Sequence, residues 1–399
     1  MRILNVSATY QPFAEFGGPP VKVEALSEGL VKRGHAVTVL TADWGLEKRL
    51  GSIQEQGKAD RSPFGWRSEV NGVQSIYLPT WLRYRATSWN PAVDRYCHAR
   101  LKEFDIAHIF GLYDLLGPAV AKACKKQNKK YVVEPIGMFV PIVRNLPLKK
   151  LYHWLWGRKL FGGASKVIAT SEREIEELAA GGIPRGKIVL RRNGVTMPAR
   201  WPERGEFRRT HGIARETKLV LFLGRLSRKK SPELLLEAFA GLPAEIAGSP
   251  LMLVFAGPDE GGMQSKLEAM TDKAGIRSRV QFIGPVFSDA KWAAYRDADV
   301  FVLPSQNENF GNSAAEAMAA GTPVIVSENC GIASLLTGEA GVVTEHDATA
   351  IRSALHQMLS DEQVRARRIA GCVALAARMG WEEPVREMEA IYSELATSQ

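Results

Sequence analysis

The chain has 399 residues, which is too long for one ordinary hydrophobic core, so two domains are expected. Its 45% apolar and 24% charged residues exclude a disordered or fibrous protein, and no apolar run approaches the ~18 residues of a membrane-spanning helix. The charge is uneven, because residues 1–200 hold 31 Lys and Arg against 17 Asp and Glu, a net +14, whereas the remainder carries −5.

The first elements form a strand–helix–strand unit. Residues 2–8 have the apolar run of a strand rather than of a signal peptide, since no cleavage site follows. A loop containing Gly17 and Gly18 leads to a helix at residues 20–33, and residues 36–42 are the next strand. Adjacent glycines let backbone N–H groups approach a phosphate closely, although this pair is too short to be a dinucleotide-binding fingerprint.

The rest of the N-terminal half alternates strands with helices, which is typical of a parallel sheet. Further strands are predicted at residues 74–78, 105–110, 130–134, 166–170 and 187–191. The polar residues 46–72 are predicted to be an irregular surface excursion. His108 lies near a strand end and is either a core histidine or one that contacts a ligand. We favour the second, because the carboxyl ends of parallel strands line ligand crevices.

Residues 144–163 form a basic, aromatic segment with helical periodicity. Its apolar stripe and its cations are Leu148, Leu151, Tyr152, Leu155 and Trp156, with Lys149, Lys150, Arg158 and Lys159. Most such stripes are packed in a core, and we favour that interpretation over a helix lying at a membrane interface.

Seven of the nine tryptophans also lie at or before position 201. A basic, Trp-rich half suits an anionic membrane surface or a polyanionic acceptor. Nucleic acid is the competing partner, but no nucleic-acid-binding motif is recognisable. An ordinary solvated face with core tryptophans is the remaining alternative.

A second α/β series follows a predicted linker at residues 196–209, which is rich in proline and charge. Its strands are predicted at residues 219–223, 251–255, 280–283, 299–303, 323–326 and 341–344. The first strand runs into a basic loop and then a helix at residues 231–242. Arg225 and Lys230 in that loop either clamp a diphosphate, as a planar fork and a point charge, or belong to a plain basic surface.

Residues 301–327 carry the strongest functional pattern. A strand, a polar loop, a short helix and a second strand place Glu308 in the loop and Glu316 in the first helical turn. The helix start offers its positive end to an anion, and a carboxylate beside it can accept hydrogen bonds from sugar hydroxyls. Alternatively, Ser313 and Glu316 form a capping box and Glu308 is only a solvated charge.

Two other groups consist of residue types that often bind metals. Asp297 and Asp299 have the spacing of an Asp-x-Asp metal motif, but they lie at the start of a strand, the wrong end for a ligand crevice. We therefore interpret them as structural. The cysteines are scattered without a Cys-x-x-Cys pair, which favours a reducing compartment: Cys97, Cys124, Cys330 and Cys372.

The sequence ENFGNSAAEAMAAGTPVIVSENCG, which includes Glu308 and Glu316, resembles the Glu-x7-Glu signature of family-four retaining glycosyltransferases. The resemblance implies an α/β protein of the GT-B fold, with two facing Rossmann-like domains, parallel sheets and a cleft between them. Residues 1–200 would be the acceptor-side domain and residues 205–380 the nucleotide-sugar-binding domain. The last helix, about residues 381–399, would pack back on the first domain.

The resemblance also implies roles for single residues. Glu308 would contact the donor sugar, Glu316 the nucleotide ribose, and Arg225 and Lys230 the donor diphosphate. The other donor-binding positions that it implies are Gly17, Gly18, Val286, Asn309, Phe310, Gly311 and Asn312. No cofactor is expected beyond the nucleotide-diphosphate sugar itself, and no metal.

Two positions depart from the family pattern. Ile136 stands where relatives usually have a histidine near the reacting centre, and Ser231 replaces a glycine after Lys230. Retention by same-face attack needs a stabilised leaving diphosphate, a held sugar and an oriented acceptor, but no histidine. We therefore expect an active enzyme in which Glu308, Arg225 and Lys230 are catalytic, with His108 as a candidate substitute for the missing side chain.

The sequence thus predicts a retaining, metal-independent glycosyltransferase. It would move a sugar from a nucleotide-diphosphate donor to a glycan or lipid-linked acceptor, in cell-surface polysaccharide or lipopolysaccharide assembly. The expected location is cytoplasmic and peripheral on the inner face of the plasma membrane. The alternatives are a catalytically impaired nucleotide-sugar-binding or scaffold protein of the same fold, and another GT-B enzyme, a phosphorylase or an epimerase.

Overall fold

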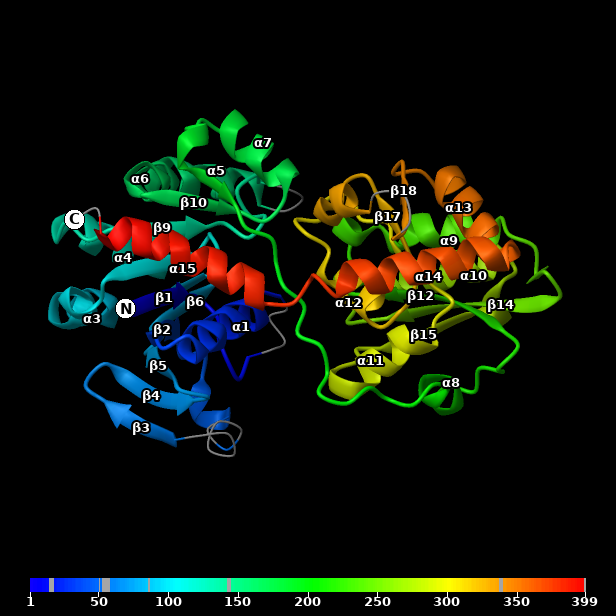
Figure 1. Ribbon diagram of the computed structural model, residues 1–399, viewed down its shortest axis with the longest axis horizontal. Coiled ribbons are helices and arrows are strands. Elements are labelled where there is room, and N and C mark those ends of the chain that lie inside the picture. Colours follow the sequence, from blue (N-terminus) through cyan, green and yellow to red (C-terminus); the bar gives the residue numbers. More distant parts are fainter. Residues whose placement is uncertain are drawn as a thin grey trace. The chain divides into compact units, whose positions relative to one another are not determined.

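The computed structural model shows two compact α/β units (Figure 1). The residues that it describes are 1–13, 18–49, 51, 58–84, 87–141, 145–336 and 340–397. Unit 1 comprises Met1–Gly194 and Trp381–Gln399, and unit 2 comprises Val195–Gly380. The predicted linker belongs to unit 2 rather than to a free connection, because Phe207 is buried in its core and Trp201 packs edge-on against Trp292.

The sheet of unit 1 has the strand order β11-β10-β9-β8-β1-β2-β5-β4-β3. Its strands are β1 (Arg2–Ser7), β2 (Ala36–Ala42), β3 (Lys58–Ser62), β4 (Gly65–Val70), β5 (Val73–Leu78), β8 (Ile106–Phe110), β9 (Tyr131–Glu134), β10 (Lys166–Ala169) and β11 (Ile188–Leu190). All neighbours pair in parallel except β3 with β4 and β4 with β5, which are antiparallel. The central strands are nearly continuous apolar runs because helices cover both of their faces.

The region predicted to be an irregular excursion contains regular structure. Strands β3 and β4 extend the sheet as a hairpin, and a separate hairpin follows, formed by β6 (Leu82–Tyr84) and β7 (Thr87–Trp89). The sequence did not predict β3 and β4 because their side chains are largely polar. An edge hairpin can have much of its surface in solvent and so needs no apolar run. At the turn into β4, a side chain on Gly65 would collide with the carbonyl of Tyr77.

The helices of unit 1 cover both faces of its sheet. They are α1 (Gly18–Lys32), α3 (Ala92–Arg100), α4 (Leu116–Lys126), α5 (Leu146–Tyr152), a π-helical turn (His153–Gly157), α6 (Arg158–Gly163), α7 (Glu172–Ala180) and α15 (Glu382–Thr397). The C-terminal helix α15, red in Figure 1, packs against α1 and β8. Met388 and Tyr392 of α15 are fully buried there.

The sheet of unit 2 has the order β13-β14-β12-β16-β17-β18, and β15 pairs with β14. Its strands are β12 (Lys218–Leu223), β13 (Glu245–Ile246), β14 (Ser249–Ala256), β15 (Val280–Gly284), β16 (Val300–Leu303), β17 (Val324–Ser327) and β18 (Val342–Thr344). Its helices are α8 (Glu206–Thr210), α9 (Pro232–Ala240), α10 (Met263–Lys273), α11 (Ser288–Asp297), α12 (Asn312–Ala319), α13 (Ala348–Ser360) and α14 (Glu362–Ala376).

Strand β12 shows how the core of unit 2 is divided. Leu219 and Leu221 join one apolar cluster with α11, α12 and α14, while Val220 and Phe222 join another with α9 and α13. This alternation follows from the two-residue period of a strand, whose successive side chains point to opposite faces.

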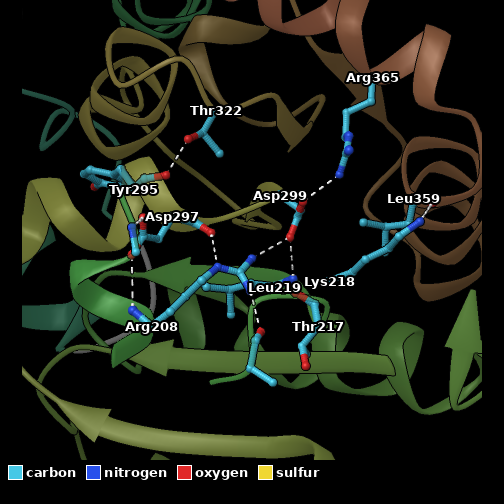
Figure 2. A network of polar contacts seen from close by, with 12 residues as sticks. Arg208, Thr217, Lys218, Leu219, Tyr295, Asp297, Asp299, Thr322, Leu359 and Arg365 are labelled. Atoms are coloured by element: carbon cyan, nitrogen blue, oxygen red, sulfur yellow. Dashed lines mark hydrogen bonds and ion pairs between the residues drawn. The ribbon is translucent and has the colours of Figure 1, made fainter. Parts of the chain in front are cut away.

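Asp297 and Asp299 brace the amino-terminal end of β16 (Figure 2). Asp297 accepts hydrogen bonds from the backbone N–H groups of Gly205 (2.6 Å) and Arg208 (3.1 Å). Asp299 accepts from the Arg208 guanidinium (2.8 Å), and from that of Arg365 (2.6 Å). Both carboxylates are thus engaged in the structural way that was predicted. Across the described ranges, no cluster of three or more His, Cys, Asp or Glu residues could hold a metal ion.

No helix in the described part of the chain is both long and apolar enough to cross a bilayer. The four cysteines are buried free thiols.

Candidate active site

The candidate site lies at the carboxyl edge of the sheet in unit 2. Strand β12 has β14 on one side and β16 on the other, so the connections leaving β12 and β16 diverge at this point. Open α/β sheets bind ligands at such a switch point. Arg225 and Lys230 follow β12, and Glu308 follows β16, so the predicted cations and the predicted sugar-binding carboxylate meet there.

Lys230 and Glu308 form an ion pair in which both side chains are about four-fifths buried. Burial alone raises the pKa of Glu308, but the charge of Lys230, with smaller effects of Lys229 and Arg225, outweighs it and holds the pKa below its ordinary value. Glu308 is therefore ionised at neutral pH. An ionised carboxylate is a strong acceptor of hydrogen bonds.

The backbone fixes the position of Glu308. Its N–H donates to the carbonyl of Asn329 (3.1 Å), and its carbonyl accepts from the N–H of Gly331 (2.9 Å). Lys230 is held by a similar link, since the carbonyl of Lys229 accepts from the N–H of Gln306 at 3.0 Å. The loops after β12, β16 and β17 are thus joined into one platform.

Arg225 follows β12 in the same platform and extends into solvent. Its side chain is 64% exposed, and its guanidinium is 3.6 Å from the carboxylate of Glu260. The loops after β12 and β14 touch at Gly224 and Gly257, where φ of Gly257 is +150° and a Cβ atom would collide with the carbonyl of Gly224. A glycine is therefore required at 257, and the close contact presents Arg225 to solvent.

Ser231 is one of the two departures from the family pattern, and its backbone conformation is the one expected of the glycine that it replaces. It adopts φ 49° and ψ 48°, the left-handed conformation that glycine reaches without strain. Its hydroxyl lies 3.0 Å from Nε2 of His346 and donates to the carbonyl of Arg228 at 3.4 Å. These two contacts offset part of the conformational cost. The loop of residues 228–231 therefore keeps this backbone conformation with serine in place of glycine.

Helix α12 begins beside Glu308, as predicted. Its N-cap is Gly311, at φ +110°, where a Cβ atom would lie 3.0 Å from Ile332. Asn312 is exposed at the first helical position and Asn309 is half-buried in the preceding loop. Phe310 is only 2% exposed, so its side chain belongs to the core and only its backbone can face a ligand.

Glu316 does not take part in a capping box. The helix begins at Asn312 with no side-chain cap, and the Glu316 carboxylate instead accepts hydrogen bonds from Lys291 (2.8 Å) and the Tyr295 hydroxyl (3.0 Å). The sequence pattern did not indicate these two partners. Their spacing of four residues, which places them on one face of α11, was the available signal. Val286 lies half-buried between β15 and α11.

The predicted residues of unit 1 are less closely grouped. Gly18 begins α1, whereas Gly17 lies outside the described residues. Ile136, which follows β9, has φ 53° and Gly137 has φ 67°. A β-branched residue in this conformation is strained. The N–H of Gly137 donates to the carboxylate of Glu174 (2.7 Å), which helps to hold the loop.

His108 differs from its prediction. It occupies the centre of β8 with no exposed surface, and its Nδ1 lies 2.6 Å from the hydroxyl of Tyr392. Burial is the largest effect on its pKa and lowers it to about 3, so the imidazole is neutral. His108 is therefore a core histidine, because the middle of a strand covered on both faces has no access to a ligand.

A buried ionic cluster around Glu134 was also missed. Its carboxylate forms ion pairs with Lys22 of α1 and with Arg191 after β11, and lies 3.5 Å from His108. Burial raises the pKa of Glu134, but Arg191 and Lys22 outweigh it and lower the pKa to about 2. Burial lowers the pKa of Lys22 to about 8 against the opposing effect of Glu134. The sequence places these residues far apart and gave no signal of their meeting.

Two Rossmann-like units are the architecture of the GT-B fold. The family model described as "Glycosyl transferases group 1" matches residues 203–371, and that described as "Glycosyltransferase Family 4" matches residues 16–197. The chain belongs to this group 1 family of glycosyltransferases, as the resemblance predicted.

The chain is 27% identical to the D-inositol 3-phosphate glycosyltransferase of Corynebacterium urealyticum, over 100% of this chain and 96% of that one. Among solved structures, HepE of Anabaena in complex with UDP and glucose covers all of both chains with a TM-score of 0.76 at 17% identity. WaaG, a glycosyltransferase involved in lipopolysaccharide biosynthesis, covers 98% of this chain and 99% of its own with a TM-score of 0.68 at 18% identity. At such identities the structural likeness establishes the fold alone.

Proposed function

We propose that this glycosyltransferase uses a nucleotide-diphosphate sugar as donor, binds it on unit 2, and transfers the sugar with retention of configuration. The observation that carries the proposal is the pairing of Lys230 with Glu308, across 78 positions of sequence, beside the exposed Arg225. A nucleotide sugar needs cations for its phosphates and acceptors for its hydroxyls, and this edge of the sheet offers both. HepE, a protein of the same fold, has been solved with UDP and glucose.

In this proposal the cationic side chains bind the diphosphate and the carboxylates bind the hydroxyl groups of the donor. Lys230 and Arg225 take the diphosphate, together with the positive end of α12, and so stabilise the leaving group. Glu308, released from Lys230, accepts hydrogen bonds from the sugar hydroxyls. Glu316 accepts from the ribose hydroxyls, with its carboxylate oriented by Lys291 and Tyr295.

The proposed chemical step uses no side chain at position 136, where this chain has Ile136 in place of the histidine usual in the family. The bond between the anomeric carbon and the diphosphate oxygen breaks, and the electron pair leaves with the diphosphate. The acceptor hydroxyl attacks the same face and passes its proton to the departing phosphate oxygen. Neither a protein nucleophile nor a histidine is required, so Ile136 is compatible with activity.

We further infer that the acceptor is a glycan or a lipid-linked molecule in cell-surface polysaccharide or lipopolysaccharide assembly, used at the inner face of the plasma membrane. The support is the net +14 charge of residues 1–200, which suits an anionic acceptor or surface.

The donor can be tested by thermal shift with a panel of nucleotide sugars, because a ligand that binds only the folded state stabilises it by mass action. We expect one nucleotide sugar to raise Tm, and Arg225→Ala to abolish that rise and lower turnover by on the order of a hundredfold. Arg367→Ala, at an exposed position of α14, is the matched control and should change neither. Tight donor binding without transfer to any acceptor would instead favour the non-catalytic binding protein.

A further inference from the structure

Of the apolar stripe predicted in residues 144–163, only Tyr152 is packed in the core, and Leu148, Leu151, Leu155 and Trp156 are exposed. Around α5 and the π-helical turn, large apolar side chains are exposed to between 36% and 64%: Leu146, Leu148, Leu151, Trp154, Leu155 and Trp156. The segment has a second apolar face, formed by Tyr152, Leu160 and Phe161, and this face is the one that packs in unit 1. Sequence periodicity could not tell which of two apolar faces would be covered.

A second exposed apolar element lies nearby. In and beside the β6–β7 hairpin, Trp81 is 72% exposed, Leu82 66% and Trp89 47%, and the two indoles stack edge-on with centroids 5.9 Å apart. Tyr113 joins the hairpin to the helical segment. Its carbonyl accepts from the Thr87 hydroxyl (2.6 Å), and its hydroxyl lies 3.1 Å from Nε2 of His153.

The exposed charge in residues 115–171, which contain the helical segment, is of one sign. Residues 115–171 contain eleven Lys and Arg but a single acidic residue, Glu134, which is buried and already paired with Lys22 and Arg191. The exposed cations Lys150, Arg158 and Lys159 lie within or next to the apolar stripe. Helix α4, which packs against α6, adds three more: Lys122, Lys125 and Lys126.

We propose that these two elements form a docking surface for an anionic lipid bilayer, and we call it the aromatic patch: Trp81, Leu82, Trp89, Leu148, Leu151, Trp154, Leu155 and Trp156. Tryptophan and leucine side chains partition into the interfacial zone of a bilayer, while lysine and arginine remain at the level of the phosphates. Because no exposed acid opposes them in residues 115–171, the cations attract an anionic leaflet without local cancellation.

Other occupants fit this surface less well. A second copy of the chain would bring an equally cationic face against it, and like charges repel at short range. Nucleic acid would satisfy the cations but would leave the exposed leucines without an apolar environment. A bilayer provides both the anionic surface and the apolar interior, and docking would bring a lipid-linked acceptor to unit 1.

The test is co-sedimentation of the full chain with vesicles of phosphatidylcholine alone or mixed with phosphatidylglycerol, at low and high salt. We expect binding to the mixed vesicles that weakens as salt is raised. Trp154→Ser combined with Leu148→Ser should weaken it at least tenfold, as should Lys150→Gln combined with Arg158→Gln. These side chains are exposed, so folding should be unaffected, and Val373→Ser, at a 52% exposed position of α14 in unit 2, is the matched control.

Failure to bind mixed vesicles at low salt would overturn the proposal, as would an equal loss in Val373→Ser. Gel filtration tests whether a second copy of the chain covers the patch. A dimer that Trp154→Ser converts to a monomer would assign the patch to that second copy. Binding of a mixed-sequence oligonucleotide that abolishes vesicle binding and survives Trp154→Ser would assign it to nucleic acid. The vesicle assay involves no sugar transfer, so its failure and failure of the donor assay can be told apart.

Discussion

At the scale of single residues, the carboxylate of Glu134 holds two cations inside unit 1. Lys22 comes from α1 and Arg191 follows β11, and all three side chains are at most 3% exposed. The ion pairs therefore tie the first helix to the far end of the sheet, next to the strained Ile136 loop. The energetic consequence is asymmetric, because removing one partner leaves the other charges buried without compensation.

Glu134→Ala should accordingly lower the free energy of unfolding by about 3–5 kcal/mol, measured by urea denaturation. Lys22→Met should cost less, since Arg191 would still neutralise the carboxylate. Glu176→Ala, at an exposed site, is the control and should stay within about 0.5 kcal/mol of the parent. If Glu134→Ala cost no more than this control, the cluster would not contribute to stability.

Glu24 of α1 provides a pH-dependent test. Burial, with a smaller effect of Glu28, raises the pKa of Glu24 to about 7 in the folded protein. The unfolded chain releases this proton at lower pH, so the folded state holds more protons between the two values and stability falls as pH rises toward 7. Glu24→Gln should therefore raise Tm relative to the parent at pH 8 but not at pH 4. Glu69→Gln, at an exposed position of β4, should show no such pH-dependent gain.

For Glu316 the structure excludes the capping box, and donor binding stays a prediction. Because its carboxylate is held by Lys291 and Tyr295 and caps nothing, Glu316→Gln should reduce donor affinity by about 1.5–3 kcal/mol, the value of a hydrogen bond to a charged group. Isothermal titration with the donor measures the affinity, and thermal melting measures folding. Lys291→Met should weaken binding less, because Tyr295 still orients the carboxylate. A variant that melted lower yet bound donor normally would restore a purely structural role for Glu316.

At the scale of elements, the loop into α12 depends on one backbone conformation. Gly311 at φ +110° directs the chain from the Glu308 loop into the helix, and its neighbour Phe310 anchors the loop in the core. The element works because a glycine tolerates a conformation that other residues rarely adopt.

Gly311→Ala should lower stability by about 1–3 kcal/mol, the cost of holding a side chain in such a conformation, and it should also weaken donor binding. Gly262→Ala is a suitable control because Gly262, the N-cap of α10, also has positive φ but has no atoms within 4 Å of its Cβ position. A stability loss in both variants with donor affinity reduced only in Gly311→Ala would support the role of this loop. Equal donor affinity in both would contradict it.

At the scale of the whole molecule, charge is divided between the sequence halves, with the basic excess in residues 1–200. The diphosphate charge in our proposal is met by Arg225, Lys230 and the start of α12. The Asp297 carboxylate already accepts hydrogen bonds from the backbone N–H groups of Gly205 and Arg208, and the Asp299 carboxylate is paired with Arg208 and Arg365.

Sugar transfer should therefore survive EDTA with little change in rate. Activity is to be measured before and after chelation, and again after addition of Mg²⁺ or Mn²⁺. Arg208→Lys, which perturbs the aspartate network, should lower Tm without creating a metal requirement. A complete loss of transfer in EDTA that Mg²⁺ reverses would return Asp297 and Asp299 to consideration as ligands.

The sequence by itself determined the class of fold, the series of parallel strands and the positions of the charged residues in unit 2. Apolar runs of strand length are local, and Arg225, Lys230 and Glu308 lie in the loops after strands that those runs already mark, whereas Glu316 lies in helix α12. The convergence of Arg225, Lys230 and Glu308 followed, because parallel strands present their carboxyl ends at one edge of the sheet.

Only the tertiary structure decided which side chains are buried and which apolar faces stay exposed. It buried His108 and joined Glu134 to Lys22 and Arg191, and it left Trp154 and its neighbours exposed. Each outcome depends on residues distant in sequence, such as Tyr392 of α15 above His108. Periodicity records that a face is apolar, but burial is a property of two surfaces in contact, and one segment of sequence specifies only one of them.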